Sequence, residues 1–232
     1  MIERRQFVTP GELLAEGDYN SGENTYRENK KIYASKTGLA NFVRNNVYVV
    51  ALSGCYIPVV GDLVIGNVVD MRLGVWLVDI NAPYISVLFA SEAVDRSFNS
   101  RREEMTKYLT IGDVVLAKII SFDRTKDPTL TIREPGLGKI PLGHIIDITP
   151  TKVPRLIGRR GSMINLIKRE TNCQITVGRN GRILINCAKL ESEALATKAI
   201  NLIEQDAHTT GLTDRINKLI KKEKKESSIH AK

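Results

Sequence analysis

The stretch that decides the fold of the C-terminal part reads Val153-Pro154-Arg155-Leu156-Ile157-Gly158-Arg159-Arg160-Gly161-Ser162-Met163-Ile164. Two glycines bracket two arginines, and apolar residues at helical spacing stand on both sides. Because Gly158 and Gly161 carry no side chain, a phosphate group can approach the main chain closely. A helix that starts after Gly161, with Ser162 as its cap, would offer N-terminal N–H groups to the same anion. The stretch therefore predicts a basic, anion-binding turn between two helices.

The same glycine spacing also fits a plainer alternative, a helix that ends at Gly158 and is followed by an ordinary turn. The sequence downstream helps to distinguish the two. Strand-like runs at 173–177 and 183–187 flank the turn Gly178-Arg179-Asn180-Gly181, and Asn-Gly is a strong hairpin signal. An amphipathic helix follows, marked by apolar residues at helical spacing: Leu195, Ala199, Leu202 and Ile203.

This order of helix, G-x-x-G loop, helix, strand, turn, strand and helix resembles a KH domain, which we expect over residues 138–207. The resemblance implies that the loop clamps the backbone of about four nucleotides of single-stranded RNA. The loop residues are Gly158, Arg159, Arg160 and Gly161. Residues 208–232 predict a final helix with Ile216, Leu219 and Ile220 on one face, followed by a lysine-rich end.

Composition and charge limit the classes of protein to which the chain can belong. The chain has 232 residues, of which 42% are hydrophobic and 26% charged, which suits two or three small domains. Its net charge of +8 favours a polyanionic partner, a nucleic acid before an anionic membrane. No apolar run approaches the roughly 20 residues of a membrane span. The N-terminal residues 1–6 lack a signal-peptide core, so we expect a cytoplasmic protein.

The cysteines predict neither a metal site nor a crosslink. Cys55, Cys173 and Cys187 form no C-x-x-C pair, which argues against a zinc ribbon. In a reducing compartment we expect all three to be buried free thiols. Cys173 and Cys187 fall on the two predicted strands of the hairpin and can therefore be neighbours, which we interpret as packing. No cofactor is predicted.

Residues 61–135 predict a small β-barrel. Five β-branched runs follow one another, at 61–70, 74–80, 85–89, 111–120 and 129–132, as in an OB-type barrel. The segment resembles the S1 RNA-binding domain in its Gly-Asp openings (Gly61-Asp62 and Gly112-Asp113), in Gly74-Val75-Trp76 and in Ser91-Glu92.

An S1 domain implies RNA contacts through exposed aromatic and basic side chains on its barrel. By position these would be Arg72, Trp76, Phe89, Arg124, Lys126 and Arg133. Each of these residues also fits a role without RNA. Trp76 also fits the barrel core because its strand is apolar on both faces, and Phe89 fits core packing. The arginines and the lysine also fit ordinary solvated charge. Leu73 stands where many S1 domains carry another aromatic residue.

Residues 1–60 predict a small β domain of short strands and frequent turns. Three stretches matter in combination: Val8-Thr9-Pro10-Gly11-Glu12, Gly22-Glu23-Asn24-Thr25-Tyr26 and Tyr56-Ile57-Pro58-Val59-Val60-Gly61-Asp62. With the S1 and KH segments they resemble the ribosomal RNA-processing protein 4 family, the RNA-binding cap of the archaeal exosome. The expected fold class is therefore multidomain α+β, with an N-terminal β domain, a five-stranded barrel and an α/β KH domain with a trailing helix.

The family resemblance implies a function without catalysis in this chain. Three cap subunits would sit on a hexameric ring of phosphate-dependent, RNase PH-like exonuclease subunits, with residues 1–60 docked on the ring. The cap would capture RNA and feed 3′ ends to the ring. The histidines show no metal or nucleophile spacing, and Glu103-Glu104 fits a solvated charged stretch, so we expect a binder and not a nuclease. The alternative is a free-standing S1/KH protein acting in translation or ribosome assembly.

Overall fold

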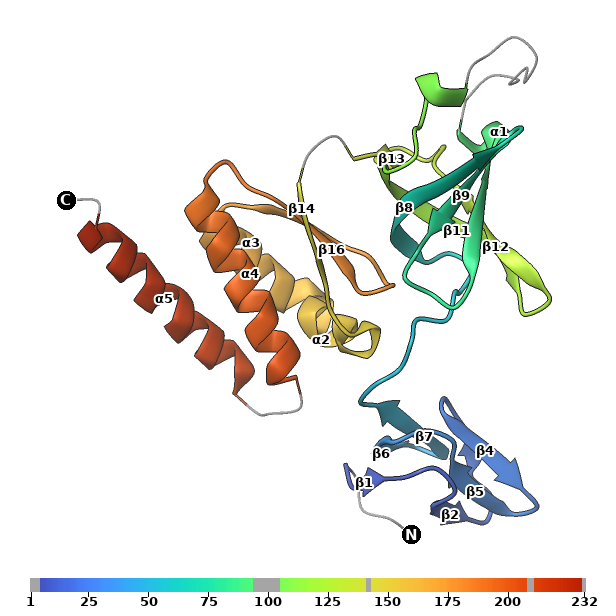
Figure 1. Cartoon of the computed structure of the whole chain (residues 1–232). Coiled ribbons are helices and arrows are strands. Elements are labelled where there is room, and N and C mark those ends of the chain that lie inside the picture. Colours follow the sequence, from blue (N-terminus) through green and yellow to red (C-terminus); the bar gives the residue numbers. More distant parts are fainter. Residues whose placement is uncertain (1–4, 94–104, 141–142, 208–210, 231–232) are drawn as a thin grey trace. The chain divides into compact units, whose positions relative to one another are not determined.

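The computed structural model describes residues 5–93, 105–140, 143–207 and 211–230, the last seven of these as helical backbone only (Figure 1). It divides into two compact units, Met1–Gly54 and Cys55–Lys232, which are described one at a time. No described helix is both long and apolar enough to serve as a membrane span. Glu103-Glu104, His208 and the polar stretch 97–102 lie outside the described residues, as does the side chain of His230.

The first unit is built from two small sheets, which confirms the predicted N-terminal β domain. One has the order β1-β6-β7-β3 and the other β2-β5-β4. The strands are β1 (Phe7–Val8), β2 (Leu13–Glu16), β3 (Asn20–Ser21), β4 (Thr25–Glu28), β5 (Lys31–Ala34), β6 (Gly38–Val43) and β7 (Asn46–Ala51). Alternating residues such as Val8, Leu14 and Ile32 are buried together between the sheets and form the core of the unit.

The second unit begins with the predicted barrel. Its strands are β8 (Leu63–Arg72), β9 (Val75–Asp79), β10 (Ile85–Phe89), β11 (Val114–Asp123) and β12 (Lys126–Thr131). They pair in the order β12-β10-β9-β8-β11, and β11 also pairs with β12, which closes the barrel. The chain after β12 contributes a further strand, β13 (Gly138–Lys139), which pairs with β11. Helix α1 (Ala90–Ala93) follows β10.

The KH domain has the predicted order of elements and one strand more. Helices α2 (Val153–Ile157), α3 (Ser162–Thr171) and α4 (Leu190–Gln205) cover one face of a sheet in Figure 1. The sheet order is β14-β16-β15, from β14 (His144–Asp147), β16 (Arg182–Asn186) and β15 (Gln174–Val177). Strand β14 was absent from the sequence prediction, because its four residues gain their strand character from pairing with β16.

A last helix, α5 (Leu212–His230), packs on α4. Its residues Leu212, Ile216 and Ile220 are buried in the same core as α2, α3 and α4. The ion pairs Lys198–Glu223 and Arg215–Asp206, both 2.9 Å long, tie the two helices at their surfaces. The predicted apolar face therefore docks on the KH domain.

The structure corrects the prediction for all three cysteines. Cys173 and Cys187 form a disulfide with a Cα–Cα distance of 4.5 Å, and Cys55 is exposed. The pairing of Gln174 with Asn186 places the two cysteines opposite each other at the end of the β15–β16 ladder. The sequence placed these two cysteines, 14 residues apart, on neighbouring strands, but their exact opposition shows only once the strand register is known.

The hairpin turn Gly178–Gly181 joins the KH domain to the barrel. Asn180 is fully buried, and its Nδ2 donates hydrogen bonds of 2.7 Å to the carbonyl oxygens of Ile65 and Ile80. The Ile65 N–H donates in return to Asn180 Oδ1 at 3.3 Å. Arg182 adds a half-buried hydrogen bond of 2.5 Å from its Nη2 to the Asp79 carboxylate. The barrel and the KH domain are therefore joined by the contacts of this turn as well as by the chain between β12 and β14.

Candidate nucleic-acid interface

The G-x-x-G loop has a conformation that its glycines make possible. Helix α2 ends at Ile157, Gly158 follows with φ 74°, and Arg159–Gly161 form a 3-10 turn that leads into α3. A Cβ on Gly158 would lie 2.8 Å from Met163 Cβ and 2.9 Å from the Met163 nitrogen. Gly161 has φ 77° and serves as the N-cap of α3. A side chain at Gly158 would therefore push the start of α3 away from the loop.

Ser162 does not take the predicted role of a cap. It is the first helical residue, Gly161 occupies the cap position, and no side chain caps the helix. The Ser162 N–H donates to the Arg159 carbonyl, and no side chain accepts from the N–H groups that follow it, so these point toward an anion bound at the loop. The helix end is more open than the sequence predicted, because a capping hydroxyl would have competed for these donors.

The loop arginines project from this turn. Arg159 and Arg160 are both exposed, and Arg160 holds a left-handed backbone conformation with φ 51°. Within the described part of the chain neither guanidinium has a hydrogen-bond or ion-pair partner. The structure therefore brings Gly158, Arg159, Arg160 and Gly161 together as one turn, with two exposed positive charges beside a helix start that no side chain caps.

On the barrel, Arg72 and Phe89 are brought together across β9. Val75 pairs with Phe89 on one side and with Arg72 on the other, so the three side chains form one row on the outer face. Phe89 is 43% exposed, and Leu73 in the adjacent turn is 84% exposed. Arg72 donates from Nε to Asp70 at 3.2 Å. This end of the barrel offers an aromatic ring next to a cation.

The structure corrects the prediction that Trp76 stacks on RNA. Trp76 has no exposed surface, and its indole N–H donates to the carbonyl of Leu109 at 3.1 Å. Trp76 follows Val75, whose side chain lies in the row on the outer face. Because successive side chains of a strand point to opposite faces, Trp76 points into the barrel, as do its neighbours in the pairing, Leu88 and Met71. The core alternative is the one that the structure shows.

Arg124 and Lys126 lie at the other end of the same barrel face. Both are exposed at the turn that joins β11 to β12. Strand β12 runs parallel to β10 with Val87 opposite Thr129, so Lys126 lies level with the start of β10. The two ends are roughly 17 Å apart along β10 at the usual rise per residue. OB-type barrels bind oligonucleotides on the second and third strands between the loops at these two ends.

Two further groups complete the rim of this face. Arg133 is exposed just beyond β12, and it lies at the Phe89 end because the Ile132 N–H donates to Glu92 in α1. Asp123, in the β11–β12 turn, accepts hydrogen bonds from the Thr125 N–H at 2.7 Å and the Thr125 hydroxyl at 2.8 Å. The backbone hydrogen bond from Thr125 lowers the pKa of Asp123, so this turn keeps an ionised carboxylate among its cations.

Sequence reasoning missed an aromatic pair on the barrel. Tyr84 and Phe122 meet edge to face with ring centroids 5.0 Å apart, and both are half-buried beside the Arg124 turn. Tyr84 precedes β10 and Phe122 nearly ends β11, so only the strand pairing brings them together. In the described residues, no three His, Cys, Asp or Glu side chains are grouped in a way that would hold a metal ion.

Comparison with known proteins assigns each part of the chain. Residues 5–53 match the family described as exosome RNA binding protein RRP4 N-terminal domain. Residues 55–121 match the S1 domain of RRP4, and residues 143–205 match the KH domain family.

Comparison over most of the chain's length finds relatives of the same family. The exosome complex component Rrp4 of Thermofilum pendens is 44% identical over 94% of each chain. Its counterpart in Pyrococcus horikoshii is 42% identical over 94% of this chain and 83% of its own. A crystal structure described as an exosome complex RNA-binding protein superposes with a TM-score of 0.71 at 42% identity, covering 75% of this chain and 99% of its own. The chain therefore belongs to the Rrp4 family of exosome RNA-binding components, with an N-terminal, an S1 and a KH domain.

Proposed function

We propose that this chain is the non-catalytic RNA-binding cap subunit of an exosome, and that it feeds single-stranded RNA to a phosphate-dependent 3′-to-5′ exonuclease ring. Three copies would sit on a hexameric ring of RNase PH-like subunits in the cytoplasm. Residues 1–60 dock on the ring, and residues 61–135 and 138–207 bind RNA. The observation that carries the proposal is the exposed Arg159–Arg160 pair, which has no protein partner in the described chain and lies beside uncapped helix N–H groups.

The junction inside the second unit supports one RNA path over barrel and KH domain. Asn180 is fully buried with hydrogen bonds to two barrel carbonyls, and Arg182 binds Asp79 of β9. Two RNA-binding surfaces held at a fixed distance bind one strand more tightly than either does alone, because the second contact is intramolecular. The S1 face and the G-x-x-G loop therefore cooperate on long RNA.

The outer face of the first unit supports its role in docking. Phe7, Leu39 and Val50 form one row across β1, β6 and β7 on the side away from the core. Phe7 is 55% exposed and Val50 is 45% exposed. An apolar row of this kind on a small β unit is suited to burial against another subunit.

A charge-reversal experiment tests the RNA-binding loop. The double variant Arg159→Asp/Arg160→Asp keeps both glycines and places acids in the phosphate path. Loss of two phosphate contacts should lower RNA affinity and reduce the slope of log affinity against log salt by about 1.4 for a single strand. The matched control reverses two exposed cations of the first unit, Lys36 and Arg44, and should bind RNA like the parent chain. Unchanged affinity and salt slope in the loop variant would exclude the loop as an RNA site.

A further inference from the structure

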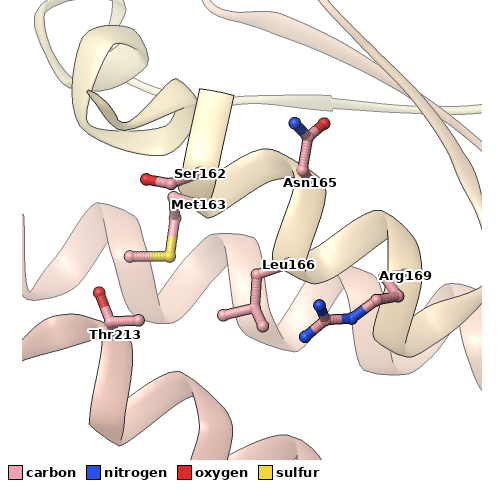
Figure 2. A pocket seen from close by; sticks show the side chains of 6 residues that line it. All are labelled: Ser162, Met163, Asn165, Leu166, Arg169 and Thr213. Atoms are coloured by element: carbon pink, nitrogen blue, oxygen red, sulfur yellow. The ribbon is translucent and has the colours of Figure 1, made fainter. Parts of the chain in front are cut away.

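A surface cavity of about 430 Å³ opens between α3 and the start of α5 (Figure 2). Its lining combines two apolar side chains, Met163 and Leu166, with four polar side chains, Ser162, Asn165, Arg169 and Thr213. Figure 2 shows Thr213 pointing from α5 toward Met163 on the opposite wall, with Leu166 between α3 and α5. The guanidinium of Arg169 lies beside Leu166, and Asn165 stands on the rim and points away from Thr213.

The cavity is continuous with the G-x-x-G loop. Ser162 directly follows Gly161, and the Asn165 amide lies 3.3 Å from where a Cβ on Gly161 would be. Ser162, Asn165, Leu166 and Arg169 share one face of α3, since they are three and four residues apart. A strand whose phosphate lies on the loop therefore reaches the cavity mouth with its neighbouring nucleotide. The opposite wall comes from α5, which follows the KH order of elements.

The chemistry of the lining fits a heteroaromatic ring. Met163 and Leu166 supply an apolar floor, and the planar guanidinium of Arg169 can stack on a base. The side chains of Ser162, Asn165 and Thr213 have no partner in the described chain and can each donate and accept, as a base edge requires. Glu170 accepts from Arg169 Nε at 3.2 Å, which uses one of the five guanidinium donors. The volume lies in the range of small-molecule sites.

We infer that this cavity holds an unstacked base of the RNA strand whose backbone lies on the G-x-x-G loop, one nucleotide beyond the loop contacts. The inference rests on the proposed RNA-binding function and adds α5 to the interface. A base placed there increases the length of RNA that the KH domain binds. The contact depends on ring stacking and on hydrogen bonds to a base edge, so it adds affinity beyond the charge of the loop.

Filling the cavity from its far wall tests the inference. Thr213→Trp places an indole against Met163 and leaves α3 and the loop unchanged, and Arg169→Ala removes the stacking cation. The full chain is titrated with oligoadenylates of about four and about eight nucleotides, the shorter matching the KH backbone clamp. Exposed positions outside the cavity supply the controls, Asn201→Trp for bulk and Lys218→Ala for charge.

We expect the longer RNA to bind the Thr213→Trp variant at least about five-fold more weakly than the parent chain, as for a lost base contact. The shorter RNA should bind the Thr213→Trp variant and the parent chain with equal affinity. The two control variants, Asn201→Trp and Lys218→Ala, should bind both RNAs with the affinity of the parent chain. In chain labelled with ¹³C at the methionine methyl groups, the Met163 resonance should shift with the longer RNA only. Parent-like binding of the longer RNA by Thr213→Trp, an equal loss in Asn201→Trp, or an unmoved Met163 resonance would overturn the inference. Binding that is insensitive to Arg159→Asp/Arg160→Asp would instead overturn the loop assignment on which it rests.

Discussion

Single residues of the barrel show how closely a side chain's role depends on strand phase. Trp76 and Phe89 are both aromatic residues on neighbouring strands, and both matched expected RNA-binding positions. Trp76 is inside the barrel and Phe89 is 43% exposed, because they belong to rows of opposite orientation. The sequence predicted both strands, but its apolar run around Trp76 left the inward and outward sides undecided. The pairing of Trp76 with the buried Leu88 shows that Trp76 points into the barrel.

Replacing these two residues should therefore affect different properties. Phe89→Ala should weaken single-stranded RNA binding by about 1–3 kcal/mol, as for a lost base stack, with little change in stability. Trp76→Phe should leave RNA affinity intact and lower the free energy of unfolding by about 1 kcal/mol through loss of the Leu109 hydrogen bond. Fluorescence titration with RNA and urea denaturation measure the two quantities. Equal RNA binding by Phe89→Ala and the parent chain would remove Phe89 from the interface.

Asn180 joins the KH domain to the barrel through hydrogen bonds with Ile65 and Ile80. Asn180→Ala leaves the carbonyls of Ile65 and Ile80 without their amide donors, so we expect a loss of about 1–3 kcal/mol in the free energy of unfolding. Binding of long RNA should weaken more than binding of short RNA, since the two surfaces lose their fixed distance. Asn201→Ala, an exposed change on α4, is the control. An equal stability for both variants would contradict the role given to this turn.

At the scale of elements, the sequence predicted features that depend on adjacent residues, but it did not predict pairings between residues far apart in the chain. Asn180-Gly181 correctly predicted the hairpin between β15 and β16, because a turn depends on adjacent residues. The same signal could not show that Asn180 binds Ile65, which lies 115 residues away. Strand β14 was missed for the same reason, since its four residues are defined by pairing with β16.

The β15–β16 hairpin is fixed at both ends, by the buried turn and by the Cys173–Cys187 disulfide. Cys187→Ser should therefore lower the free energy of unfolding by about 3 kcal/mol, the value expected for a loop of this length. Cys55→Ser, at an exposed free thiol, should change nothing. Denaturation of both variants, with and without a reductant, makes the comparison. If reductant failed to destabilise the parent chain, the crosslink would carry no stability.

The whole molecule combines an apolar-faced β unit with a basic unit in which barrel and KH domain are joined through buried contacts. Family resemblance predicted this combination, and the matches to RRP4 N-terminal, S1 and KH domains confirm it. Composition alone indicated only a polyanionic partner. The proposed roles, ring docking by residues 1–60 and RNA binding by the barrel and the KH domain, involve the entire chain, so they have to be tested on the assembly.

The most direct measurement is the rate at which an RNase PH-like ring degrades single-stranded RNA in the presence of phosphate and this chain. We predict that the full chain accelerates degradation and co-purifies with the ring, and that it degrades no RNA without the ring. A chain lacking residues 1–54 should still bind RNA but lose both co-purification and acceleration. The variant Arg159→Asp/Arg160→Asp should co-purify but accelerate less. Equal rates with and without the full chain, or full acceleration by the chain lacking residues 1–54, would contradict the account.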